Sequence, residues 1–171
     1  NYSLFTLLQY TILRKLKLQT GLRYDNKSIS TESVGLPSDA EGYRPAIKNS
    51  YGSFSGSVGA TFTYNEDLLF RSNFAAAYRT PNLAELTSNG PHELRFERGD
   101  ANLVPENSRE IDLSLHYHID NLIFDISGFY NKINNYIFIA PTGDTTNTGM
   151  SIYSYNQTDS YLFGGETGFH Y

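Results

Sequence analysis

The residues of this chain whose types could support chemistry do not form a recognised catalytic motif. Ser, His and Asp are present, but the sequence holds no G-x-S-x-G nucleophile elbow, no P-loop and no H-E-x-x-H zinc motif. It has no cysteine, which excludes disulfides, thiol catalysis and Cys-ligated metals. His116 and His118 share one face of an expected strand as a possible metal pair, but a polar strand face explains them more simply. We therefore expect neither an enzyme nor a metal or cofactor site.

Charge and composition narrow the class of protein further. The chain has 171 residues, with 13 Lys and Arg against 18 Asp and Glu, giving a net charge of −5. Nucleic-acid binding without sequence preference needs clustered positive charge, so no nucleic-acid partner is expected. No run of about 18 apolar residues occurs, which excludes a transmembrane helix, and no signal peptide is visible after Asn1. Aromatic residues are plentiful although only 39% of the chain is hydrophobic, a combination that suits sheets with one apolar face.

Hydrophobic residues recur with a period of two along most of the chain, which predicts β-strands. The pattern is clear over 15–27, 51–64, 68–79, 110–119 and 122–127, and it returns over 152–171. Residues 2–13 are apolar on both faces and are assigned as a strand, and the blurred phase around 131–135 indicates a β-bulge. About seven long strands result. Their apolar faces need a second sheet or lipid to cover them; the positions expected to face lipid include Leu18, Leu22, Phe70, Phe74, Leu113, Leu115, Phe124 and Ile126.

The connections between these strands alternate in length. Short turns are expected at 13–14, 65–67 and 120–121, and long connections near 30–50, 81–107 and 141–151. Bacterial outer-membrane barrels have this asymmetry, with tight periplasmic turns and long extracellular loops. The only helix expected is a short one near 82–88, with Asn82 as its N-cap, Glu85 three residues on and Gly90 past its end.

The stretch from Phe70 to Ile139 resembles the barrel of TonB-dependent outer-membrane receptors. Five segments, taken together, match motifs of that family: GLRYD at 21–25, YRTPNLAEL at 78–86, GDANLVPE at 99–106, FYNKINNYI at 129–137 and GGE at 164–166. In the GDANLVPE segment, Asp100-Ala101 stands where the family usually has Asn-Pro. Pro105 preserves the turn. The matches span most of the chain, which is similar to a part of such a barrel.

This resemblance implies an all-β fold, an antiparallel meander of long strands that forms part of a transmembrane β-barrel of about 22 strands when complete. Residues 1–171 would all belong to the barrel domain, and the plug domain of the same receptor would lie outside them. The implied function is active transport across the bacterial outer membrane, driven through the TonB complex by the missing part of the chain. Five residues are expected to face the lumen or the plug: Arg79, Glu85, Glu110, Asp112 and Glu166. Without a plug, Arg79, Glu110, Asp112 and Glu166 should be solvated rather than paired.

The long loop 81–107 is the segment we expect to contact a ligand. A ferric siderophore or similar iron chelate would be gripped by Arg95, Phe96 and Arg98. An alternative is haem, because haem receptors of the family carry a ligand histidine where His92 stands, and imidazole is a haem ligand. A third alternative, a soluble β-sandwich that binds carbohydrate on its aromatic face, leaves the ordered motifs unexplained.

Overall fold

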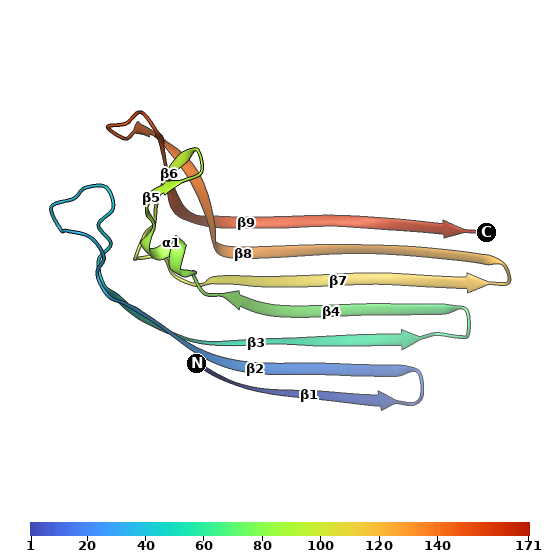
Figure 1. Ribbon diagram of the computed structural model, residues 1–171. Helices are drawn as coiled ribbons and strands as arrows, with labels where there is room; N and C mark the ends of the chain where they lie inside the picture. Colours follow the sequence, from blue (N-terminus) through green and yellow to red (C-terminus); the bar gives the residue numbers. More distant parts are fainter.

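The computed structural model describes residues 1–171, and most of them lie in β-strands (Figure 1). The seven long strands are β1 (Tyr2–Ile12), β2 (Leu16–Thr31), β3 (Ile47–Thr63), β4 (Leu68–Arg79), β7 (Glu106–Ile119), β8 (Leu122–Thr145) and β9 (Ser151–His170). The connection from β4 to β7 adds three short elements, α1 (Leu83–Thr87), β5 (Asn89–His92) and β6 (Arg95–Arg98). The nine strands make one sheet, ordered β1-β2-β3-β4-β7-β8-β9-β6-β5. The predicted antiparallel meander is confirmed, and β5 and β6 are additions that the sequence pattern missed.

The two ends of the sheet differ in the way that the alternating connections predict. All three tight turns lie at one end of the strands and all three longer connections at the other (Figure 1). Leu13, Arg14 and Asp120 adopt positive φ in their turns, and the Asn65 side chain accepts hydrogen bonds from the backbone N–H groups of Asp67 and Leu68. The longer connections therefore gather into a loop cluster at one end of the strands, whereas the other end carries only tight turns.

The predicted extent of the last long connection was wrong. Strand β8 continues to Thr145 and β9 starts at Ser151, so only residues 146–150 connect them. Pairing between β8 and β9 shifts register twice, between Ile133 and Tyr136 and again between Pro141 and Thr145. The first shift confirms the expected bulge, where Asn135 has a φ of 56°. The second shift hides the strand periodicity, which is why the sequence read as a loop.

The strand register places the apolar and polar residues on opposite faces of the sheet. Phe62 of β3 pairs with Phe70 of β4, and Phe70 pairs with Leu115 of β7. The pairs Thr61–Arg71 and Asn73–Asp112 alternate with these on the other face. All eight positions expected to face lipid fall on the apolar face. No second sheet covers that face, so large side chains such as Leu113 are 57% exposed.

The small hydrophobic core lies under the loops rather than under the sheet. Ile47, Leu86, Leu103 and Ile137 form one buried cluster, and Pro81 is fully buried. Helix α1 confirms the predicted helix: Asn82 and Glu85 make the reciprocal hydrogen bonds of a capping box. Its C-cap is Ser88, and Gly90, expected just past the end, lies within β5 instead. No helix of the structure has the length and apolar character needed to cross a membrane.

Candidate functional site

Arg79, the last residue of β4, joins two buried carboxylates at the loop end of the sheet. Its Nη1 lies 2.9 Å from Glu85 Oε1, and its Nη2 lies 2.6 Å from Glu106 Oε1. The Nε–H donates a further bond of 2.8 Å to Glu106 Oε2, so the guanidinium grips that carboxylate with two nitrogens. Glu85 and Glu106 are only 7% and 8% exposed. Both need Arg79 as a counter-charge, because a buried carboxylate without a partner is costly.

The two carboxylates also accept backbone hydrogen bonds from other elements. Glu85 Oε2 accepts from Asn82 N–H at 2.8 Å, and Glu106 Oε1 accepts from Ile137 N–H at 2.7 Å. One network therefore connects β4, α1, β7 and β8, and it uses residues from the YRTPNLAEL and GDANLVPE segments. The expectation that Arg79 is solvated in the absence of a plug was wrong. The loop supplies Glu85, and β7 supplies Glu106, so the chain itself completes the pairing.

The β5–β6 hairpin carries a second cluster, centred on buried Glu97. Its Oε1 lies 3.0 Å from His92 Nδ1 and 2.6 Å from Arg95 Nη2. Its Oε2 accepts a hydrogen bond of 3.1 Å from the Tyr155 hydroxyl of β9. The Arg95 guanidinium also lies 5.3 Å from the ring centre of Tyr153, a cation–π distance. These contacts and the parallel pairing of β6 with β9 fix the hairpin against the first residues of β9.

The Glu97 carboxyl stays ionised in this cluster although it is buried. Burial on its own would raise the pKa of Glu97, because it penalises the charged form. The hydrogen bonds from His92, Arg95 and Tyr155 outweigh burial, and the pKa lies below its ordinary value. Because the folded pKa is depressed, the stability from this cluster is present above the unfolded-state pKa and is lost as pH falls through the lowered value.

The structure brings the four residues expected to contact ligand onto one hairpin but gives them different surroundings. The His92 side chain is 64% exposed near the hairpin tip, and Arg95 is engaged by Glu97. Phe96 is only 4% exposed and pairs with Ile152, so its ring faces the interior of the loop cluster. Arg98 is exposed, forms no ion pair and lies 5.9 Å from the Phe96 ring centre. Glu97 was missed, although Arg95 and Glu97 at i and i+2 of a strand share a face.

The polar face of the sheet holds most of the residues expected to face the lumen. Glu110 accepts a hydrogen bond from the Asn131 amide at 2.7 Å, and Asp112 accepts one from the Asn73 amide at 3.1 Å. Glu166 is exposed on the same face, opposite Ser127. None of these three carboxylates forms an ion pair, and no pairing was expected for them without a plug. The two amide hydrogen bonds orient the Glu110 and Asp112 side chains on the polar face.

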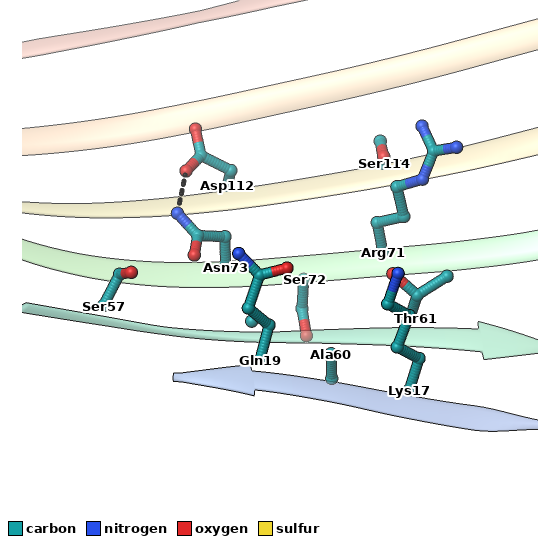
Figure 2. A pocket seen from close by; sticks show the side chains of 11 residues that line it. Lys17, Gln19, Ser57, Ala60, Thr61, Arg71, Ser72, Asn73, Asp112 and Ser114 are labelled. Carbon is teal, nitrogen blue, oxygen red and sulfur yellow. Dashed lines mark hydrogen bonds between the residues drawn. The ribbon is translucent and has the colours of Figure 1, made fainter. Parts of the chain in front are cut away.

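A shallow pocket of about 350 Å³ opens on this polar face across β2, β3, β4 and β7. Figure 2 shows Lys17 and Gln19 rising from β2 beside Arg71 and Asn73 of β4, with Asp112 behind them on β7. Short side chains between them, such as Ser57 of β3, leave the floor open. Lys17 and Arg71 form no ion pair, and the pocket lining holds these two cations against one carboxylate, that of Asp112.

The two histidines of the expected strand face have separate partners. His116 Nδ1 lies 2.6 Å from Asp125 Oδ1, and His118 Nε2 lies 3.1 Å from the carbonyl oxygen of Asp120. A carbonyl only accepts, so His118 donates through Nε2. Both residues belong to the polar face near the tight turns, as the alternation predicts.

Comparison with known proteins identifies the class. The family model of the TonB-dependent receptor-like β-barrel matches residues 1–171. The chain belongs to this family, whose members are transporters of the bacterial outer membrane rather than enzymes. The soluble carbohydrate-binding β-sandwich is thereby excluded, in agreement with the single sheet.

Solved structures share the fold at low sequence identity. The chain is similar to the Serratia marcescens hemophore receptor HasR, solved with its hemophore and heme, at 18% identity and a TM-score of 0.74 over 98% of this chain and 31% of HasR. The copper transporter OprC matches at 21% identity and 0.79, over 98% and 25%. The siderophore receptor PirA from Pseudomonas aeruginosa matches at 19% and 0.72, over 98% and 30%. The chain thus spans less than a third of these solved proteins.

Proposed function

We propose that this chain is the ligand-contacting part of the barrel wall of a TonB-dependent receptor that takes up a ferric siderophore or a similar iron chelate. Its outward face contacts outer-membrane lipid, and its polar face receives the plug domain of the same receptor. The TonB complex acts through a part of the receptor outside residues 1–171. The loops at the end opposite the tight turns bind the chelate before transport, as functional loops on a rigid scaffold commonly do.

The observation that carries this proposal is a pair of exposed cations in the loops. Arg98 forms no ion pair and borders a pocket of about 270 Å³ with Tyr43 and Pro45 of the β2–β3 connection. Arg44, from the same connection, is exposed beside Gly90 of β5 and also forms no ion pair. Two unpaired guanidinium groups in a chain of net charge −5 provide charge-assisted hydrogen bonds for an anionic chelate. Arg95, held by Glu97, supports the hairpin rather than the ligand.

Haem is the second candidate ligand, and the contact between His92 and Glu97 favours it. An ionised Glu97 can only accept, so the His92 Nδ1–H donates to it, and in the neutral imidazole this leaves the Nε2 lone pair free. A carboxylate that holds one imidazole nitrogen in this way orients the other toward a metal. The exposed His92 side chain therefore offers an axial ligand for haem iron.

Binding to the purified full-length receptor distinguishes the two ligands. We expect the double variant Arg44→Ala/Arg98→Ala to weaken binding of a ferric catecholate by about tenfold or more, because two charge-assisted contacts are lost. The matched control is Arg14→Ala, which removes an exposed cation at the opposite end of the strands. Quenching of intrinsic tyrosine fluorescence by the ferric chelate gives the dissociation constants, since the chain has 14 tyrosines.

Titration of the same receptor with haemin tests the alternative. Under haem uptake, the wild type shifts the Soret band and His92→Ala abolishes the shift, while the arginine double variant retains it. A receptor that binds neither the ferric catecholate nor haemin would contradict both assignments. Equal affinity of the wild type and the arginine double variant for the chelate would contradict the role given to Arg44 and Arg98.

A further inference from the structure

Two basic residues face each other across strands on the apolar face of the sheet. The register pairs Arg109 of β7 directly with Lys132 of β8, and both side chains are exposed. Arg109 shares the apolar face with Ile111, two positions along β7. Lys132 shares it with Tyr130, two positions along β8. Both cations therefore belong to the face that contacts lipid, in contrast to Arg71 and Lys17 on the polar face.

The position of this pair along the strands coincides with the outer edge of the apolar band. From Arg109 to the tight turn, the outward positions of β7 are Ile111, Leu113, Leu115, Tyr117 and Ile119, and those of β8 from the turn are Leu122, Phe124, Ile126, Gly128 and Tyr130. None is charged. The stretch of β7 from Arg109 to Ile119 is ten residue steps long. At about 3.3 Å per step, on a strand tilted by about 40°, it spans about 25 Å of membrane. That height equals the apolar band of outer-membrane barrels, about 25 Å, so the pair lies at the outer-leaflet headgroups.

Neither cation has a partner within the chain. Arg109 and Lys132 make no ion pair and no side-chain hydrogen bond, in contrast to Arg79 and Arg95 near the loops, which each pair with a glutamate. Like charges directly opposite each other destabilise a sheet. The nearby acid is Asp159, two positions before Tyr161 in β9, and Tyr161 is the cross-strand partner of Lys132. Asp159 accepts a hydrogen bond from Asn135 N–H. The pair therefore presents uncompensated positive charge at the membrane surface.

We propose that Arg109 and Lys132 bind a phosphate of a phosphorylated glycolipid in the outer leaflet. An anion between two adjacent cations removes their mutual repulsion and forms charge-assisted hydrogen bonds with both. Tyr130 and Tyr161, neighbours of Lys132 whose rings stack 6.5 Å apart, provide an aromatic surface at the level where interfacial aromatic residues lie. This site is separate from the ligand-binding loops and does not depend on which iron chelate the receptor transports.

Native mass spectrometry of the full-length receptor tests this proposal. The probes are bisphosphorylated lipid A and the same lipid with both phosphates removed, each exchanged into detergent micelles with the receptor. We expect the wild type to retain the phosphorylated lipid at least about tenfold better, since each basic residue near a membrane surface contributes about 1 kcal/mol toward an anionic lipid. We expect Arg109→Gln/Lys132→Gln to lose this preference.

The control is Arg14→Gln/Arg71→Gln, which removes two cations that lie at the turn end and on the polar face. This control should retain the phosphorylated lipid as well as the wild type does, and Arg109→Lys/Lys132→Arg should also retain it. Equal retention of both lipids by the wild type would overturn the proposal without any variant. Unchanged lipid preference in Arg109→Gln/Lys132→Gln would overturn it as well.

Discussion

Replacing Arg79 by Ala is expected to destabilise the loop end of the barrel wall by about 1–3 kcal/mol, the cost of leaving buried polar groups without their partner. The cost stays below that of a fully buried ion pair because the Arg79 side chain is itself 42% exposed. The substitution leaves Glu85 and Glu106 buried with no cation. The two carboxylates must then expose themselves to water or take up protons, and either response releases α1 from the start of β7. Limited proteolysis of the folded full-length receptor between residues 81 and 107 measures this release.

Arg71→Ala provides the matched control. Arg71 lies on the same strand and the same face as Arg79, eight residues earlier, but forms no ion pair. Its loss should leave the protease sensitivity of the loop unchanged. If Arg71→Ala and Arg79→Ala open the loop to the same extent, the network of Arg79, Glu85 and Glu106 does not hold it.

Gly99→Ala is expected to dislodge the segment that follows β6. An added Cβ at Gly99 would lie 2.6 Å from Thr87 N and 2.7 Å from both Leu86 C and Ser88 N. These are backbone atoms at the end of α1, so no side-chain rotation relieves the overlap. The close approach exists because Gly99 N–H donates to Ser88 O at 2.7 Å and Asp100 N–H donates to Glu85 O at 2.8 Å. Overpacking of this kind commonly costs about 1–3 kcal/mol, and more where only backbone can move.

Gly90→Ala, in the same loop, is the control for Gly99→Ala. Its added Cβ would meet only the flexible Arg44 guanidinium, at 3.5 Å. Hydrogen exchange of α1 and β6 in the full-length receptor should increase in Gly99→Ala and stay at the wild-type level in Gly90→Ala. Unchanged exchange in Gly99→Ala would show that the loop does not need this close approach.

The strands and their faces could be predicted because each is determined locally. In β7, apolar and polar residues alternate from Ile111 to Ile119 with no interruption, and a period of two needs no knowledge of neighbouring strands. The same holds for α1, whose capping residues Asn82 and Glu85 are three positions apart. The turns at 65–67 and 120–121 likewise carry their own signals in Asn and Asp.

The loop cluster could not be predicted because its contacts join distant segments. Glu106 is 27 residues from Arg79, and Tyr155 is 58 residues from Glu97, so no local pattern links them. Strand β5 has four residues and includes Pro91, which a sequence pattern treats as a strand breaker. It is tolerated because β5 is the last strand of the sheet and leaves an edge unpaired. Burial of Phe96 depends in the same way on the parallel pairing of β6 with β9.

The central claim is that one face of this sheet contacts lipid and the other lines the barrel lumen. Spin labels at two adjacent positions of β7, Leu113 and Asp112, test it in the full-length receptor reconstituted into bilayers. We expect the label at Leu113 to relax faster with oxygen, which concentrates in lipid, and to be shielded from a water-soluble nickel chelate. The label at Asp112 should not show this lipid signature. A label at Asp112 that is reached by oxygen, with one at Leu113 reached by the nickel chelate, would contradict the assignment of the two faces.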